Sequence, residues 1–255
     1  MQSFLIGLQF LTRIQLQKQT VWTEESFGRS VRYFPLVGLV LGICYGLAAF
    51  AMAIVPQVYG FHFPEHIRTF ILMLLPVILT GGIHCDGFMD TVDGIFSGRD
   101  RERMLEIMKD SRAGSFGVVA MILLLLGNYA ALLDMPAEWL TSAMVVMPVI
   151  GRLMMAGVVS CCKYARPEGI GKAFAQYNNA RSFLWVLMYS LVLVSFLSVA
   201  GLIAIFACGI FTAIFCYFID KKLGGVTGDV YGAVCILNEL LVLYVYVIIG
   251  CVFVR

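Results

Sequence analysis

Three aspartates stand at helical spacing in the stretch G-G-I-H-C-D-G-F-M-D-T-V-D-G, which covers residues 81–94. Asp86, Asp90 and Asp93 are related as i, i+4 and i+7, so a helix would place them on one face. A run of apolar residues precedes them, and carboxylates in or beside lipid need a partner of opposite charge. Mg²⁺ prefers oxygen ligands and is usually held by one or two carboxylates together with substrate phosphates. The spacing therefore predicts these three carboxylates as ligands for magnesium-assisted chemistry on a phosphate ester.

The segment K-D-S-R, residues 109–112, supplies basic groups suited to such a reaction. It lies directly before the next apolar stretch, where its charges would face a phosphate that arrives at the membrane surface. Arginine binds phosphate bidentately, and lysine binds it as a point charge. We therefore predict that Lys109 and Arg112 bind the substrate phosphate, with Asp110 as a further ligand or an orienting partner. The mixed charges Arg101, Glu102 and Arg103 fit a solvated helical face equally well.

A second glycine-acid stretch, G-G-V-T-G-D-V-Y-G-A, covers residues 224–233 and repeats the opening Gly-Gly-x-x-x-Asp of the first. The repeat is either a short internal duplication or a chance recurrence of Gly-Gly. In both cases Asp229, like Asp86, follows glycines that allow a backbone to approach a phosphate closely. We expect these two aspartates at the same membrane level.

Three further polar residues are candidates for the same site. Glu239 lies inside the last apolar segment, so it should face the bundle interior or a cavity. It is expected to reach the metal site or to pair with Arg152, which also lies in an apolar stretch. His84 precedes Asp86 by two residues and could be a general base, a ligand or an ordinary interfacial residue. The interfacial reading of His84 is favoured.

The composition sets the class of protein: 60% of the residues are hydrophobic and 13% are charged, with a mean hydropathy of +0.89. These values indicate an all-α polytopic membrane protein and exclude an ordinary soluble domain. The net charge of +2 gives no reason to expect a nucleic-acid partner. The eight cysteines lack paired metal-ligand spacing and are interpreted as small core residues.

Seven apolar segments have about the length that a transmembrane helix needs. They cover residues 33–55, 67–83, 114–133, 140–160, 182–198, 201–219 and 231–254. The fifth and sixth are separated by little except Gly201, which allows a tight hairpin or a differently broken pair. The segment from Ser3 to Ile14 fits an additional interfacial amphipathic helix. It lacks a basic start and a small-residue cleavage site, so we expect no cleaved signal peptide.

Lys and Arg accumulate in alternate loops, which predicts the orientation of the bundle. The groups are Arg13, Lys18, Arg29 and Arg32; Arg99, Arg101, Arg103, Lys109 and Arg112; Lys163, Arg166, Lys172 and Arg181; and Lys221 with Lys222. The other loops hold Arg68, the terminal Arg255 and acids such as Asp134. The N-terminus and the motif-bearing loops should therefore face the cytoplasm, with the C-terminus outside.

The motifs resemble those of the cobalamin-5′-phosphate synthase family, also called the adenosylcobinamide-GDP ribazoletransferase family. The resemblance runs through F-L-T-R-I (10–14), F-P-L-V-G (34–38), residues 81–94, R-D-R-E-R-M-L-E-I-M-K-D-S-R-A-G-S-F-G (99–117), A-R-P-E-G (165–169) and residues 224–233. The Asp-rich stretch combined with E-I-M-K-D-S-R is very specific. One departure is Gln15, where the family usually has a proline after T-R-I.

This resemblance implies one integral membrane transferase domain over residues 1–255, in the bacterial or archaeal cytoplasmic membrane. It implies a late step of cobalamin biosynthesis, the assembly of the nucleotide loop. Adenosylcobinamide-GDP and α-ribazole, or its 5′-phosphate, would be joined with loss of GMP, and other cobalamin-assembly enzymes are possible partners. In that reaction Asp86, Asp90 and Asp93 would hold Mg²⁺, and Lys109 and Arg112 would neutralise the transferred phosphate. Either Asp93 or Asp110 would accept the proton of the attacking hydroxyl.

Three other activities remain as alternatives. A prenyltransferase would need a D-D-x-x-D or N-D-x-x-D run, and none occurs. A CDP-alcohol phosphotransferase would continue its motif as D-G-x-x-A-R, which residues 95–97 do not provide. A cation-coupled transporter would need acids along a path through the span centres, whereas these acids cluster at one edge.

Overall fold

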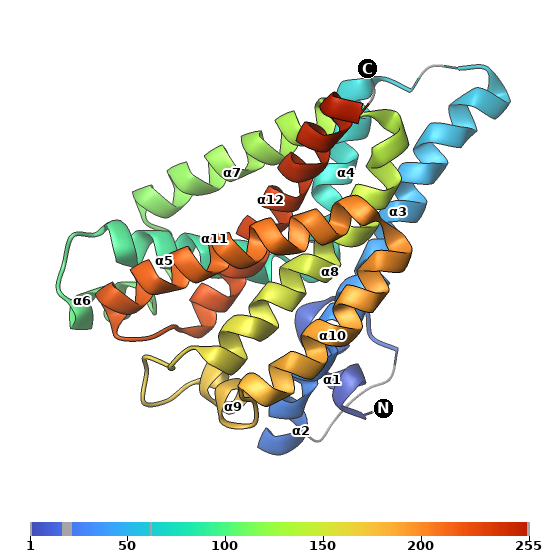
Figure 1. The fold of residues 1–255 in the computed structure, drawn as a ribbon. Helices are drawn as coiled ribbons and strands as arrows, with labels where there is room; N and C mark the ends of the chain where they lie inside the picture. The colour runs from blue at the N-terminus through green and yellow to red at the C-terminus, as the bar shows by residue number, and fades with distance from the viewer. Residues whose placement is uncertain (1, 17–21, 62, 254–255) are drawn as a thin grey trace.

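The computed structural model describes residues 2–16, 22–61 and 63–253, and it is helical with no strand in those ranges (Figure 1). Two basic residues that entered the orientation prediction, Lys18 and Arg255, lie outside the described residues. The elements are α1 Gln2–Leu11, α2 Glu24–Gly28, the 3₁₀ helix η1 Arg29–Tyr33, α3 Phe34–Tyr59, α4 Glu65–Thr80, α5 Ile83–Phe96, α6 Arg101–Ile107, α7 Ser115–Leu133, α8 Ala137–Cys161, α9 Ile170–Gln176, α10 Ala180–Leu197, α11 Val199–Leu223 and α12 Gly228–Phe253.

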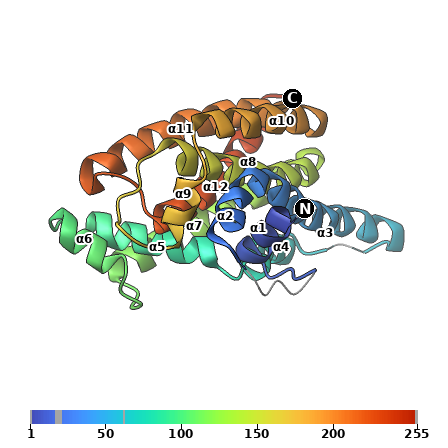
Figure 2. The same ribbon diagram turned by 90° about the horizontal axis from the view of Figure 1, so that it is seen from below.

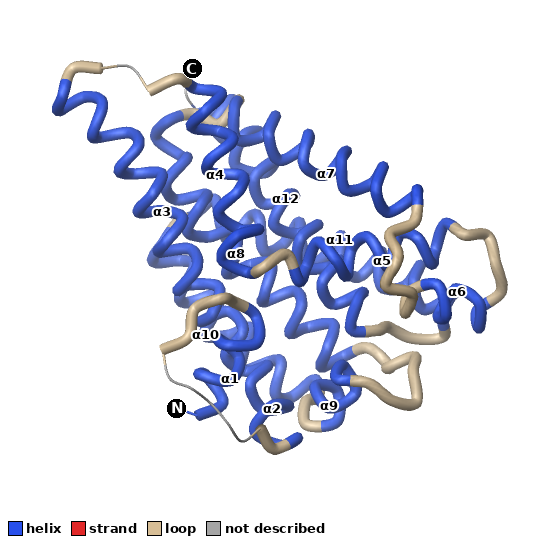
Figure 3. The backbone as a smooth tube through the Cα atoms, turned by 180° about the vertical axis from the view of Figure 1, so that it is seen from behind, coloured by secondary structure: helices blue, strands red, loops and turns tan. Residues whose placement is uncertain are grey.

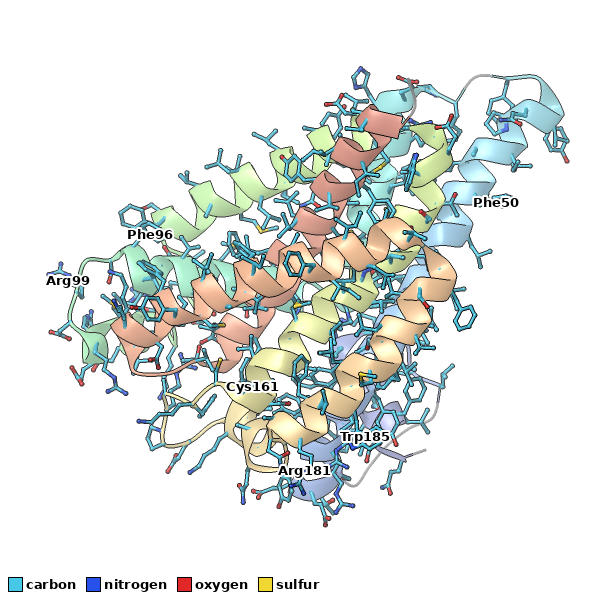
Figure 4. All side chains as sticks on the ribbon, in the orientation of Figure 1. Phe50, Phe96, Arg99, Cys161, Arg181 and Trp185 are labelled. Atoms are coloured by element: carbon cyan, nitrogen blue, oxygen red, sulfur yellow. The ribbon has the colours of Figure 1, made fainter. Side chains whose placement is uncertain are left out.

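Six described helices, α3, α7, α8, α10, α11 and α12, are long and apolar enough to cross a membrane. Large apolar side chains such as Phe50 and Trp185 project from their outer faces (Figure 4). Outward apolar residues in such number suit lipid and not water. The prediction of an all-α polytopic bundle is therefore confirmed. The predicted segments match these six helices to within a few residues at most ends.

The second predicted span differs from the structure. α4 ends at Thr80, and the chain continues as α5 after a bend of 90°. Gly81 and Gly82 cause the break because both have positive φ, 67° and 74°. Their N–H groups bind Ile78 O and Val77 O, the hydrogen-bond pattern that closes a helix end at glycine. The bundle thus has six spans, or seven if α4 and α5 together form one broken span.

The fifth and sixth predicted spans are separate helices. α10 ends at Leu197, and the extended backbone of Ser198 joins it directly to α11. Gly201 lies inside α11, where an added Cβ would collide with Val194. The hairpin alternative is therefore confirmed, with its break three residues before the glycine.

α8 forms the centre of the bundle and packs against α3 and α12 (Figures 1 and 2). Glycines on α3 allow α3 and α8 to approach each other closely. A Cβ at Gly38 or Gly42 would collide with the α8 backbone at Pro148 or Val145. The predicted helix near the N-terminus is present as α1. Its Ile6 and Leu11 are fully buried against other helices.

The charged loops gather at one end of the bundle (Figure 3). Residues 97–100, 108–114, 162–169 and 224–227 lie there with α6 and α9, whereas the end of α12 and the start of α4 lie at the other end (Figures 1 and 3). The two glycine-acid stretches therefore share one end of the molecule, as the sequence predicts.

Candidate functional site

The three aspartates of the first motif lie on the single helix α5, as their spacing predicts, but in different environments. Asp86 is exposed, Asp90 is half-buried and Asp93 is buried. The break at Gly81 and Gly82 turns this helix across the end of the bundle, where it packs against α12 and α7. The turn in the chain therefore presents the acids to the loops at the charged end.

Asp93 joins α5 to the start of α7. Its Oδ2 accepts a hydrogen bond from Gly114 N and its Oδ1 accepts one from Gly117 N, both at 2.9 Å. An added Cβ at either glycine would collide with this carboxylate. An acid beside free N–H groups at a helix N-terminus is favourable. The predicted metal or catalytic residue Asp93 therefore also holds two helices together.

Asp229 of the second motif lies beside the first motif because α5 and α12 approach closely. A Cβ at Gly87 would lie 2.8 Å from Asp229 O, and one at Gly232 would lie 3.3 Å from His84 Cα. Glycine at both positions leaves room for the opposing backbone. The Asp90 carboxylate interacts electrostatically with Asp86, Asp93 and Asp229. The structure thus brings together the two glycine-acid stretches.

Arg166 is a site residue that the sequence reasoning did not select. Its Nη2 lies 2.8 Å from Asp229 Oδ2, and both side chains are largely buried. Its Nε has no hydrogen-bond partner among the described residues. Thr227 Oγ1 donates to the same Asp229 oxygen at 3.1 Å. The motif A-R-P-E-G was the available signal, although nothing in it shows that its arginine meets Asp229.

Backbone pairing fixes the position of Arg166. Ala165 N donates to Val226 O, and Val226 N donates to Lys163 O, each at 2.8 Å. Arg101 strengthens this connection, since it donates to Leu223 O at 2.7 Å and to Ala165 O at 3.1 Å. Arg101 is still exposed and lies 3.3 Å from Glu102, as the solvated-face interpretation expects, but its guanidinium also has this connecting role.

The solvated-face interpretation holds for Arg103, which forms an exposed pair with Glu106 at 2.7 Å. Arg101 differs because its side chain also reaches the last residue of α11 and the loop that follows α8. These two arginines occupy the same short helix α6, so the sequence alone could not separate their roles.

Lys109, Asp110 and Arg112 lie in the loop between α6 and α7. Arg112 Nη2 donates to Asp110 Oδ2 at 2.7 Å, and Arg112 Nε donates to Oδ1 at 3.1 Å. These hydrogen bonds lower the pKa of Asp110 to about 2. Among the described residues, no hydrogen bond or ion pair joins Lys109, Asp110 or Arg112 to the acids of α5. A substrate phosphate bound to Arg112 would replace Asp110 as its partner.

A buried ionic cluster lies beneath the acidic helix. Arg152 is fully buried and donates through Nη1 to Glu239, so the expected pairing of these two residues is confirmed. Its Nη2 lies 3.3 Å from His84 Nε2. His84 is itself buried, which makes the interfacial reading wrong. Burying such a charge requires a partner and hydrogen bonds, and both are present here.

Asp86 lies between two adjoining cavities. One, of about 530 Å³, is lined by Arg13, Thr80 and other residues of α1 and the α4–α5 turn. The second, of about 180 Å³, lies between α5, α9 and α12 and is lined by Asp229. Phe10 and Ile83 border both. An elongated ligand could thus occupy both sides of the Asp86 carboxylate.

The acids fit a magnesium site that a substrate completes. In the ranges that the structure describes, no group of three or more His, Cys, Asp and Glu side chains could enclose a metal ion. Mg²⁺ needs only one or two carboxylates when waters and substrate phosphates supply its other ligands. Asp86 and Asp229 line one cavity and Asp90 interacts electrostatically with both, so one or two of these carboxylates are available for such an open site.

Comparison with known proteins gives one consistent result. The family model described as Cobalamin-5-phosphate synthase matches residues 3–247. Similar proteins carry the name adenosylcobinamide-GDP ribazoletransferase. One from Clostridium acetobutylicum is 36% identical over 92% of this chain and 91% of its own, and one from Desulfitobacterium hafniense is 37% identical over 95% of each. One from Pseudomonas putida is 36% identical over 95% of this chain and 97% of its own. No solved structure matches.

Proposed function

This chain belongs to the cobalamin-5-phosphate synthase family, and we propose from that membership that it is an adenosylcobinamide-GDP ribazoletransferase of cobalamin biosynthesis. In this reaction a ribose hydroxyl of α-ribazole, or of its 5′-phosphate, attacks the cobinamide-side phosphorus of adenosylcobinamide-GDP. A new P–O bond forms, the bond to the GMP oxygen breaks, and the hydroxyl proton passes to a base. The observation that carries the site assignment is that Asp86 of α5 and Asp229 of α12 line the same cavity, with Asp90 interacting electrostatically with both.

The acidic residues would hold the metal at this place. Asp86 and Asp90 are the proposed magnesium ligands, and Asp229 supports them from α12. Bound Mg²⁺ would neutralise charge on the diphosphate and on the leaving GMP. Asp93, a predicted third ligand, already accepts two backbone hydrogen bonds.

Basic residues would bind the substrate phosphates. Arg166 has an unpartnered Nε beside the acids, so it is the proposed contact at the reacting phosphate. Lys109 and Arg112 keep their predicted role as phosphate contacts, since both side chains are exposed on the loop before α7. All three basic residues would act by positioning the phosphates and neutralising their charge, which phosphoryl transfer mainly requires.

Of the two predicted proton acceptors, Asp110 is the weaker candidate, and the role of Asp93 stays a prediction. A general base works best when its pKa lies near the working pH. The pKa of Asp110 is lowered to about 2 by its hydrogen bonds with Arg112, which makes its carboxylate a weak base. The Asp93 carboxylate interacts electrostatically with Asp90, and both of its oxygens already accept backbone hydrogen bonds.

We place the active end of this integral membrane protein at the cytoplasmic face of the inner membrane. The support is the gathering of the basic loops at that end, since Lys and Arg remain on the cytoplasmic side. Contacts with other cobalamin-assembly enzymes stay a prediction.

The test of this function is release of GMP from adenosylcobinamide-GDP by the purified protein. Acceptor and Mg²⁺ are each supplied or withheld, the metal by chelation. We expect release only when both are present. Release without acceptor would contradict the transfer reaction, and release without metal would contradict the magnesium site. Absence of release, together with cation flux into sealed vesicles, would favour the transporter alternative.

A further inference from the structure

A cavity of about 670 Å³ lies between α8, α10 and α11, away from the acidic helix. Its lining is mainly apolar or small and includes Met154, Gly157, Phe183, Gly209 and Ala213. An added Cβ at Gly209 would meet no atom within 4 Å, so the wall is open at this position. The volume of the cavity lies in the range of about 300–1,000 Å³ that is typical of small-molecule sites.

The cavity faces the outside of the bundle. α10 and α11 diverge from their junction at Ser198, with α8 behind them (Figure 1). The two helices form the outermost layer on that side (Figure 2). Their neighbouring outward residues Phe206, Ile210 and Ile214 are large, apolar and exposed. In a membrane this hollow therefore opens toward lipid.

One end of the cavity is polar and has two lysines at or beside it. Lys163 and Asp220 line this end, near Cys161 at the end of α8 (Figure 4). The Lys221 Nζ lies 4.5 Å from the centre of the Tyr217 ring, and Tyr217 is also a lining residue. Lys163 thus lines the cavity, and Lys221 lies against a lining ring, both at the level where α8 and α11 end.

We propose that this cavity binds an anionic phospholipid, with one acyl chain between α10 and α11 and its phosphate beside Lys163 and Lys221. The apolar walls suit a hydrocarbon chain and offer few groups to a polar substrate. The basic rim suits the phosphate, since lysines near a membrane surface attract anionic lipid. The inference rests on this cavity alone and does not depend on the proposed reaction.

The bound lipid would also contact the segment that positions Arg166. Lys163 and Val226 both line the cavity, and their backbones form one of the hydrogen bonds that hold Ala165 and Arg166 near Asp229. A lipid bound in the cavity would therefore stabilise the backbone hydrogen bond between Val226 and Lys163. This gives the membrane a direct structural role beside the acidic site.

Photolabelling of the full-length protein in nanodiscs tests the proposal. The discs are made of phosphatidylcholine and contain a trace of one probe lipid with a diazirine on its acyl chain. The probe is phosphatidylglycerol in one sample and phosphatidylcholine in the other. Mass spectrometry then locates the labelled residues. We expect labels concentrated around Met154, Phe183 and Ala213, and more labelling by phosphatidylglycerol. Labels spread evenly over all exposed helices, or equal labelling by both lipids, would overturn the proposal.

Variants that fill the cavity or remove its charge sharpen the test. Gly209→Phe and, separately, Ala213→Phe should abolish cavity labelling, whereas Val119→Phe on the exposed face of α7 should leave it unchanged. Lys163→Gln should reduce the preference for phosphatidylglycerol about fivefold. Unchanged labelling in either cavity variant that elutes as folded protein would contradict the site. Protection of the cavity only in cross-linked dimers would assign it to a second copy of the chain instead.

Discussion

Asp93 and Arg166 show why individual residues of this site were only partly predictable. The spacing correctly placed Asp93 on the acidic helix, but its hydrogen bonds to Gly114 and Gly117 depend on where α7 begins in space. Arg166 was visible as a basic residue in a motif, yet its partner Asp229 is distant in sequence. Pairs of this kind arise from tertiary packing, which residue spacing does not record.

Arg166 should matter for chemistry more than for binding of the whole substrate. We predict that Arg166→Gln lowers kcat of GMP release about 10²- to 10³-fold, as loss of a charge-stabilising donor does. Arg166→Lys should recover part of this loss because it keeps the charge without the planar fork. Arg103→Gln, which removes an exposed pair, is the matched control. A normal kcat in folded Arg166→Gln would remove Arg166 from the site.

Asp110 should contribute little as a base. Its pKa of about 2 in the folded protein lies below the usual value for aspartate. The carboxylate is therefore ionised at higher pH and becomes protonated only as the pH falls through about 2. We predict that Asp110→Asn keeps the shape of the kcat profile near neutral pH. Steady-state GMP release measured across pH checks this. A loss of about 10²-fold or more would instead identify Asp110 as the general base.

At the scale of elements, hydropathy predicted helices well and their bends poorly. The boundaries of α8 and α12 follow the apolar runs closely, because a helix in lipid must satisfy its own backbone. The run at residues 67–83 predicted a span without a break, because hydropathy carries no information on φ. Gly81 and Gly82 end that helix and turn α5, and this turn is what presents the acids.

The contact between α5 and α12 should depend on Gly87. A Cβ there would lie 2.8 Å from Asp229 O, and a backbone oxygen cannot move aside as a flexible side chain can. We predict that Gly87→Ala lowers the stability in detergent by about 1–3 kcal/mol and lowers GMP release with it. Thermal unfolding would measure this, with Gly209→Ala as the control because its Cβ enters open space. Equal unfolding temperatures for the two variants would contradict the close approach.

At the scale of the whole molecule, the basic loops and both glycine-acid stretches lie at one end, and the end of α12 lies at the other (Figure 1). Charge bias along the sequence was sufficient to predict this separation. We predict that alkaline phosphatase fused after residue 255 is active in cells, whereas green fluorescent protein fused there is dark, because the chain would end outside the cytoplasm. The opposite pair of results would invert the orientation.

The central claim is that acids from α5 and α12 form one metal site. Electron paramagnetic resonance of Mn²⁺, used in place of Mg²⁺, tests it most directly, with adenosylcobinamide-GDP present and acceptor absent. We predict that Asp86→Asn and Asp229→Asn each weaken Mn²⁺ binding strongly, whereas Asp134→Asn, at the opposite end of the bundle, binds like the wild type. Wild-type Mn²⁺ binding by folded Asp86→Asn or Asp229→Asn protein would contradict the claim.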